Sequence, residues 1–220
     1  MIQVAVVDDL LLNRSCLKLY LAQSTEVAVV YDTDDGHEFL NYLKGKDHHI
    51  DVLLLDLHMP KLSGFDLCQL IKENYPHIKI LIVSQLTDVE NVHKVLVTGA
   101  DGFFSKNTDP FLLEAAILHV VKFEYYFSID LTEVIKLAWD MPEIDKNKSP
   151  LVDISPVEKS VMMQTAKGKS SKEIGIMLDI SKRTVDKHRE NILKKTNQSN
   201  IIGSIIFALK HEILSIGDMN

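Results

Sequence analysis

Short apolar segments alternate with longer amphipathic segments through residues 1–124, and this alternation constrains the fold more than any other feature. The pattern predicts a series of strands that are each followed by a helix. Such strand-helix units are typical of a doubly wound parallel sheet, where ligands bind beyond the carboxyl ends of the strands. The predicted strands are residues 4–7, 27–31, 52–55, 78–83 and 102–105, with helices near 13–22, 35–44, 64–74, 88–98 and 109–124.

The third predicted strand, VLLL at 52–55, runs directly into a carboxylate, Asp56. An uninterrupted aliphatic run indicates a strand that helices cover on both faces. Asp56 is therefore either a solvated residue at a strand end or a reactive group held at the edge of an apolar core. The residues that follow the other strands bear on this choice.

Polar side chains follow three more of the predicted strands. Asp8 and Asp9 follow the first strand, Ser84 follows the fourth and Lys106 comes after the fifth. Carboxylates crowded at one edge repel one another, and a bound proton or a divalent cation relieves the repulsion. Mg²⁺ suits this set best, because it binds carboxylates, keeps several waters and bridges to phosphoryl oxygens. One carboxylate could then act as a nucleophile and form an acyl phosphate.

The charge is unevenly distributed and indicates two modules. Residues 1–149 carry 13 Lys and Arg against 23 Asp and Glu, whereas residues 150–220 carry 11 against 8. An acidic front and a basic tail suggest different partners. The predicted seam is DMPEIDKNKSPLVDI at 140–154, where two prolines and a charged middle oppose regular structure. Before it, YYFSIDLTEVIKLAW at 125–139 predicts a short helix that contains the single tryptophan, Trp139.

Helix start signals are dense in the basic tail. Ser155 and Ser170 each open a capping box, Ser181 caps a third helix, and Asn200 opens a fourth. A short turn at 178–180 separates the second and third helices, which predicts a helix-turn-helix module. The fourth helix carries an apolar stripe that would cover the module's core or pair with a second copy: Ile202, Ile205, Ile206, Leu209 and Ile213.

The third helix of the tail has one apolar and one cationic face. Val185, Ile192 and either His188 or Arg189 recur at helical spacing and are expected to face the core. The opposite face could contact phosphates and base edges of DNA. Its candidate DNA-binding residues are Lys182, Arg183, Thr184, Lys187, Asn191, Lys194 and Lys195.

Composition excludes several other classes. The hydrophobic share of 46% and charged share of 25% are those of an ordinary globular protein. We expect a cytoplasmic protein without a membrane partner, because the N-terminus lacks a basic region and no apolar run approaches the length of a membrane span. The two cysteines, Cys16 and Cys68, have no neighbouring Cys or His and support neither a disulfide framework nor a zinc site.

Residues 1–124 resemble the receiver domain of bacterial two-component response regulators. The resemblance rests on VVDD (6–9), LLLDLHMPKLSG (53–64), IVSQ (82–85) and GADGFFSK (99–106). It implies a flavodoxin-like, five-stranded sheet of order 2-1-3-4-5. It also implies the role of each site residue. Asp56 would be the phosphoacceptor; Asp9, Asp56 and the His58 carbonyl would bind Mg²⁺, with Asp8 acting through water; and Ser84, Phe103 and Lys106 would sense the phosphate.

The tail resembles the LuxR/FixJ-type DNA-binding domain over residues 152–214, through GKSSKEIGIML (168–178) and ISKRTVDKHRENILKK (180–195). Both resemblances together imply a NarL/FixJ-class response regulator: a receiver at 1–124, a linker with a short helix at 125–154, and a small four-helix DNA-binding domain at 155–220. Such a protein is a transcription regulator and not an enzyme. Its implied partners are a sensor histidine kinase, double-stranded promoter DNA and a second copy of itself.

Some positions leave alternatives open. His58, two residues after Asp56, either affects the attack of water on the acyl phosphate or is simply exposed at the mouth of the site. Phe103, where the family often has Tyr, is either a switch that works by ring packing or part of the core. Asp186 and Glu190 stand where the family often has basic residues. They either accept from cytosine amino groups or pair with Arg183, Lys187 or Lys194.

Two other functions compete with a phosphorylation-gated regulator. The receiver could be a constitutive dimerisation scaffold for the DNA-binding tail, although the complete acidic set argues against this. A haloacid-dehalogenase-like phosphohydrolase also uses a strand-end Asp with Mg²⁺. That chemistry needs a second Asp two residues later as acid and base, and His58 occupies this position.

Overall fold

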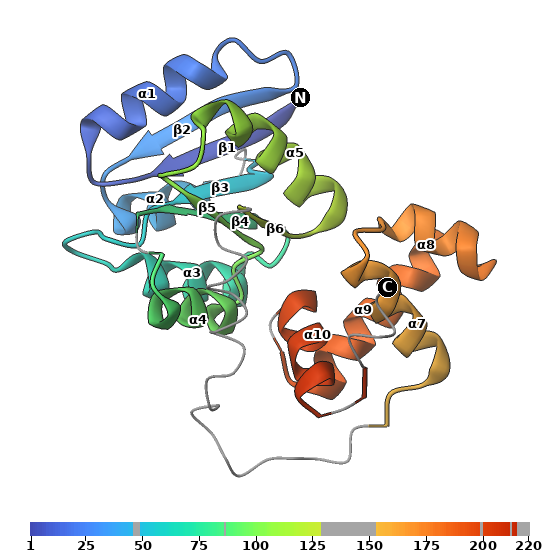
Figure 1. The fold of residues 1–220 in the computed structure, drawn as a ribbon. Helices are drawn as coiled ribbons and strands as arrows, with labels where there is room; N and C mark the ends of the chain where they lie inside the picture. The colour runs from blue at the N-terminus through green and yellow to red at the C-terminus, as the bar shows by residue number, and fades with distance from the viewer. Residues whose placement is uncertain (46–48, 86, 129–152, 199, 212, 215–220) are drawn as a thin grey trace.

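The computed structural model describes residues 1–45, 49–85, 87–128, 153–198, 200–211 and 213–214. An α/β unit is followed by a helical unit (Figure 1). Trp139 and most of the predicted linker lie outside the described residues. Among the described helices, none has both the length and the apolar character needed to cross a membrane.

The front unit contains the predicted parallel sheet, with one additional strand. The strand order is β2-β1-β3-β4-β5-β6, and every neighbouring pair is parallel. The order of the first five strands is the one expected. The helix prediction is wrong for Tyr126–Phe127, which form a sixth strand because their backbone pairs with β5. The strands are β1 (Ile2–Val7), β2 (Val27–Thr33), β3 (Val52–Leu55), β4 (Lys79–Ser84), β5 (Gly102–Ser105) and β6 (Tyr126–Phe127).

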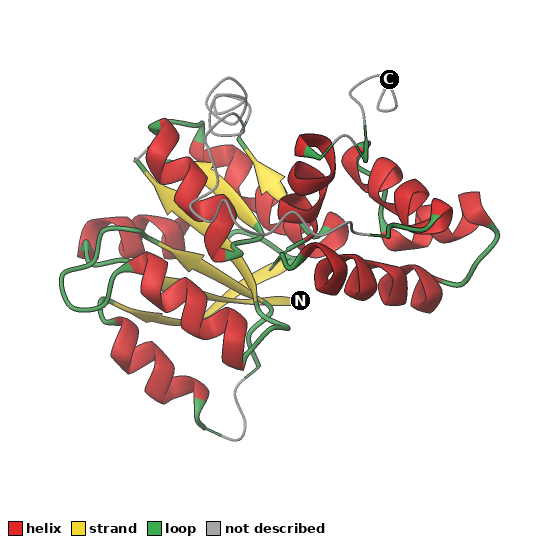
Figure 2. Ribbon diagram, turned by 90° about the horizontal axis from the view of Figure 1, so that it is seen from below, coloured by secondary structure: helices red, strands yellow, loops and turns green. Residues whose placement is uncertain are grey.

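Helices cover both faces of this sheet (Figure 2). One apolar cluster joins alternate strand residues to the second, third and fourth helices, and another joins the remaining strand residues to the first and fifth. This two-sided burial explains why VLLL of β3 is aliphatic throughout. The helices are α1 (Leu11–Leu21), α2 (Gly36–Leu43), α3 (Gly64–Asn74), α4 (Val89–Thr98) and α5 (Leu113–Phe123), with a 3₁₀ turn at Pro110–Leu112 before α5.

Local signals explain where these helices begin and end. The Ser63 and Asp88 side chains accept hydrogen bonds from backbone N–H groups in the first turns of α3 and α4. Asp109 accepts from the Phe111 N–H in the 3₁₀ turn. Gly99 ends α4 in the left-handed conformation, with a φ of 90°.

The tail forms the four helices expected: α7 (Pro156–Ala166), α8 (Ser171–Leu178), α9 (Lys182–Thr196) and α10 (Ile201–Lys210). Both predicted capping boxes are present, and Ser181 caps α9. Asp179 turns the chain between α8 and α9 with a φ of 54°. Gly175 of α8 lies so close to this turn that a Cβ would meet the Ile180 carbonyl oxygen at 2.7 Å. Helices α8 and α9 therefore form a tight helix-turn-helix.

The predicted stripe of α10 faces two different partners. Ile205 lies in the core of the tail, whereas Ile206 packs against the receiver cluster to which α4 contributes. The stripe thus covers the core of the tail, as expected, and also contacts the other domain. The Ile202 and Leu209 side chains lie outside the described residues.

Gly64 permits the close approach of α3 to the end of β3. A Cβ at Gly64 would meet the Asp56 carbonyl oxygen at 2.1 Å and the Leu57 Cα at 2.7 Å. Both are backbone atoms, so Gly64→Ala should destabilise the receiver by about 1–3 kcal/mol. Urea unfolding followed by circular dichroism measures this loss.

Gly36→Ala is the matched control, because its Cβ would meet only side-chain atoms of Leu62 and Leu67 at 3.1 Å. Gly36→Ala should lower the free energy of unfolding by clearly less than Gly64→Ala does. Equal losses in the two variants would show that the backbone approach at Gly64 does not limit packing.

Candidate functional site

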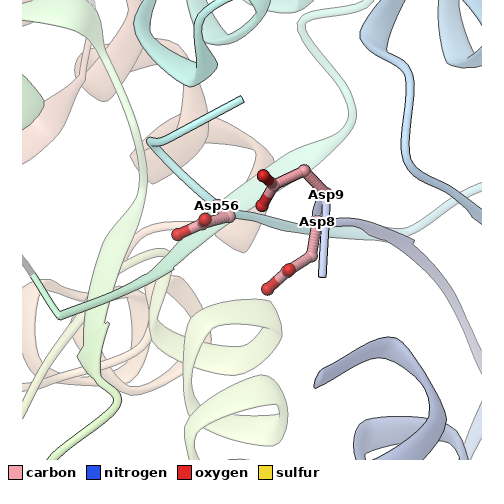
Figure 3. A group of neighbouring side chains, drawn as sticks. All are labelled: Asp8, Asp9 and Asp56. Carbon is pink, nitrogen blue, oxygen red and sulfur yellow. The ribbon is translucent and has the colours of Figure 1, made fainter. Parts of the chain in front are cut away.

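Three carboxylates gather at the carboxyl edge of the sheet, where β1 and β3 end (Figure 3). Asp8, Asp9 and Asp56 each offer an oxygen within 4.8 Å of the others. Asp8 and Asp56 are only 2% and 6% exposed, and Asp9 is half-buried. The sheet produces this cluster, because Val7 pairs with Leu55 and the Asp56 N–H donates to the Val7 carbonyl at 2.9 Å.

Lys106 contributes the positive charge of the cluster. Its ammonium lies 2.8 Å from Asp8 Oδ2 and 3.2 Å from Asp56 Oδ1. Its backbone N–H donates to the Ser84 carbonyl at 2.9 Å, which fixes Lys106 just beyond the pairing of β4 with β5. One ammonium therefore bridges two buried carboxylates.

The electrostatics of Asp56 leave its negative charge poorly compensated. Burial raises the pKa of Asp56 above its ordinary value, Lys106 acts in the opposite direction, and the nearby Asp8 raises it further. The net shift is upward, so Lys106 does not fully offset the cost of ionising Asp56. A divalent cation with oxygen ligands would offset it, and the three carboxylates are the ligand type that Mg²⁺ prefers.

A cavity of about 350 Å³ opens over the cluster. The candidate residues Ser84, His58 and Lys106 line it beside Asp9 and Asp56. His58 is exposed at the mouth, which is the simpler of its two interpretations. Phe103 is not among the lining residues. It is fully buried in the core cluster, so its ring fills the core.

Sequence patterns did not single out two residues of α1 that contact Asp8. The Asn13 amide lies 3.2 and 3.3 Å from the two carboxylate oxygens of Asp8. Arg14 Nη1 donates to the Asp8 carbonyl at 2.7 Å, and Arg14 Nε lies 3.3 Å from Asp32 of β2. The available signal was the position of these polar residues in the first turn of a helix that starts directly after the acidic pair.

The tail presents the predicted cationic face on α9. Val185, Arg189 and Ile192 are buried, which selects Arg189 over His188 as the core-facing residue. The other face is open, although Asn191 is half-buried. Its exposed residues include Lys182, Arg183, Thr184, Lys187 and Lys194.

Ion pairs modify this face. Lys187 Nζ lies 3.4 Å from Glu190, a pairing that was expected. Asp186 pairs instead with Lys182 at 2.9 Å, one helical turn earlier. Burial would raise the pKa of Asp186, but its interactions, first among them the hydrogen bond from Lys182, hold the pKa below its ordinary value. Both acidic residues of α9 are thus paired within the helix.

Lys195 differs from the other candidate DNA-binding residues. Its ammonium donates to the Glu158 carboxylate of α7 at 2.7 Å and to the Asp153 carbonyl at 2.8 Å. Glu158 is only 3% exposed. Burial would raise the pKa of Glu158, but the hydrogen bonds from Lys195 and Ser155 lower it below its ordinary value. Lys195 therefore has a structural partner.

Fold and site together define a signal-receiving α/β domain joined to a helix-turn-helix domain. The family of response regulator receiver domains matches residues 4–118, and the family of bacterial regulatory proteins of the luxR type matches residues 153–208. The chain belongs to the two-component response regulators that carry a LuxR-type DNA-binding domain and control transcription.

Curated relatives align over nearly the whole chain. The chain is 30% identical to the transcriptional regulatory protein DegU of Brevibacillus brevis, over 96% of this chain and 94% of DegU. It is also 30% identical to the oxygen regulatory protein NreC of Staphylococcus epidermidis, over 96% of this chain and 99% of NreC. Both alignments thus span the two domains of this chain.

Solved structures support the fold. The response regulator RcsB of Salmonella typhimurium matches with a TM-score of 0.57 and 22% identity, over 93% of this chain and 96% of RcsB. A structure of two RcsB dimers bound to two parallel DNAs matches with the same TM-score and identity, over 94% and 96%.

Lys195 and Lys187 should respond differently to the same substitution. Lys195→Met leaves the buried Glu158 without its cation, so it should destabilise the tail by about 1–3 kcal/mol at neutral pH. The folded-state pKa of Glu158 is lowered, so this stabilisation is lost as the pH falls through that pKa, and the difference should shrink in acid. Thermal unfolding followed by circular dichroism measures it.

Lys187→Met is the matched control on the exposed face. It should leave stability nearly unchanged but weaken DNA binding and reduce the salt slope by about one unit. If Lys195→Met gave that DNA phenotype with wild-type stability, the structural assignment of Lys195 would be wrong.

Proposed function

We propose that this protein is a transcription regulator controlled by phosphorylation of Asp56. The observation that carries the proposal is the buried Asp56 carboxylate, held beside Asp8, Asp9 and the Lys106 ammonium at the mouth of a cavity. The donor would be a sensor histidine kinase. The protein would act in the cytoplasm on promoter DNA, as a homodimer and without enzymatic activity of its own.

In the proposed reaction, an Asp56 oxygen forms a bond to phosphorus, and the bond between phosphorus and the donor breaks with its electron pair leaving on the donor. Mg²⁺ would neutralise charge on the phosphoryl oxygens. Asp9, Asp56 and the His58 carbonyl would hold it directly and Asp8 through water. Lys106 would turn from the carboxylates towards the phosphoryl group. The buried edge keeps Asp56 weakly solvated and positions it for attack.

Ser84 and Phe103 would report the phosphate to the rest of the receiver. Ser84 lines the cavity and could donate from its hydroxyl to the phosphoryl group. Phe103 lies in the same apolar cluster as Val92, Val95 and Leu96 of α4, so a change in its packing would reach α4. Without a hydroxyl, Phe103 can act only through its ring.

The proposed domains are a receiver at 1–124, a linker at 125–154 and a DNA-binding domain at 155–220. Contacts between the two domains favour control of dimerisation. Asn200 Nδ2 donates to the Ala100 carbonyl at 2.8 Å, Arg189 Nη1 lies 3.0 Å from Glu124, and Ile206 packs against the receiver. The receiver thus contacts α10, the helix expected to pair with a second copy. Lys182, Arg183 and Lys187 of the DNA-reading face stay exposed in this arrangement.

Incubation with acetyl phosphate and Mg²⁺ tests the proposed phosphoacceptor. Wild-type protein should gain one phosphoryl group by intact mass spectrometry, and Asp56→Asn should gain none, because an amide has no carboxylate oxygen to act as the nucleophile. Asp34→Asn makes the same change on an exposed loop and should behave as wild type. Phosphate uptake by Asp56→Asn at the wild-type level would refute the assignment. If uptake changed neither size nor DNA affinity, the receiver would be a constitutive scaffold.

Asn200→Asp separates the domain contact from the helix cap. Asp keeps an oxygen for the Gly203 N–H, which Asn200 Oδ1 accepts at 2.7 Å, but it cannot donate to Ala100. The variant should release α10, so that unphosphorylated protein dimerises several-fold more tightly by analytical ultracentrifugation. Asn41→Asp makes the same change on the exposed side of α2 and serves as control. An unchanged dimer affinity in Asn200→Asp would remove this contact from the regulation.

A further inference from the structure

Among the described residues of α1, Asn13 is the one whose polar side chain contacts the Asp8 carboxylate. Its Nδ2 lies 3.3 Å from Asp8 Oδ1 and 3.2 Å from Oδ2, and Asn13 also lines the cavity over Asp56. The amide must present its nitrogen here, because its carbonyl oxygen would repel a carboxylate. Asn13 therefore donates towards both oxygens of Asp8.

The other donors to the Asp8 side chain behave differently. The Leu10 backbone N–H is fixed in the chain, 2.9 Å from Asp8 Oδ1. The Lys106 ammonium is shared, at 2.8 Å from Asp8 and 3.2 Å from Asp56. In the proposed reaction Lys106 moves to the phosphoryl group, and Asp8 then keeps only uncharged donors from this set.

We propose that Asn13 is a positioning residue of the divalent cation site. Its amide holds the Asp8 carboxylate in the orientation that the hydrated cation needs, and it does so whether Lys106 pairs with Asp8 or with phosphate. The inference rests on the proposed function, since it assigns Asn13 a role at the same cation site. Groups that orient the ligands of a metal commonly change metal affinity by about 10-fold to 100-fold when removed.

A structural role is the competing explanation. Asn13 is the third residue of α1, and Leu10, which precedes this helix, makes no side-chain cap. The contact between Asn13 and Asp8 could therefore simply tie down the start of the helix. The two roles differ in what they predict for cation binding.

Asn13→Leu removes the donor and keeps a comparable size in a helix-favouring residue. Titration of metal-free protein with Mn²⁺, followed by calorimetry, should show affinity reduced about tenfold. Asn41→Leu makes the same change on the exposed side of α2 and should leave the affinity unchanged. Wild-type Mn²⁺ affinity in Asn13→Leu overturns the proposal, and a loss of stability alone leaves Asn13 as a structural residue only.

Asn13→Asp provides the second readout. The new carboxylate lies beside Asp8 in either role and repels it, so the metal-free variant should melt at a lower temperature than wild type. If Asn13 belongs to the cation site, added Mn²⁺ relieves this repulsion and should raise the melting temperature of the variant by more than that of wild type; an equal rise in both proteins contradicts the proposal. A metal-free variant that melts above wild type contradicts the proposal.

The results for the Asn13 variants can be distinguished from the result of the phosphoacceptor test on Asp56. Phosphate uptake that depends on Asp56, with wild-type Mn²⁺ affinity in Asn13→Leu, would reject the role of Asn13 and leave the proposed function standing. Phosphate uptake by Asp56→Asn would reject the proposed function whatever the Asn13 variants do.

Discussion

The repulsion among three carboxylates at one sheet edge is the constraint on which the rest of the receiver depends. The pairing of β1 with β3 fixes Asp8 and Asp56 together in a buried place, where neither can withdraw into solvent. A single ammonium, Lys106, is shared between them, and burial raises the pKa of Asp56 despite this ammonium. This deficit supports the proposal that the edge binds a divalent cation and accepts a phosphoryl group, towards which Lys106 would turn.

The sequence alone was sufficient to predict the structural features that follow from hydrophobic periodicity. Strand positions followed from apolar runs, and the carboxyl ends of parallel strands necessarily share an edge, so Asp8, Asp9, Asp56, Ser84 and Lys106 could be brought together before any coordinates. Capping boxes at Ser155 and Ser170 also encode their helices locally. The sixth strand was missed because Tyr126 and Phe127 are too short a run to show a period, and its pairing with β5 is a tertiary contact.

Side-chain partners could not be predicted in the same way. In the sequence, Lys195 is one of several cationic residues on α9. Only the packing of α7 against α9 brings the buried Glu158 carboxylate close enough to pair with Lys195. Asn13 and Arg14 lie in an amphipathic helix, where polar residues ordinarily face solvent. Their contacts with Asp8 depend on the orientation of α1 relative to the end of β1, and no short sequence motif specifies that orientation. The pairing of Asp186 with Lys182 was accessible from spacing alone, since the two residues lie one helical turn apart.

The positions of the two domains have a mechanical consequence. Asp56 lies at the carboxyl edge of the sheet, whereas the contacts with the tail involve Ala100, just before β5, and Glu124, just after α5, at the opposite edge. A signal must therefore cross the receiver. The apolar cluster that contains Leu55, Leu57 and Phe103 continues through α4 to Ile206 of the tail. Because such a core is close-packed, α4 cannot shift without changing the neighbours of Ile206. In the proposed function, phosphorylation of Asp56 would therefore act on α10 by repacking this one cluster, while Lys182, Arg183 and Lys187 of α9 stay exposed.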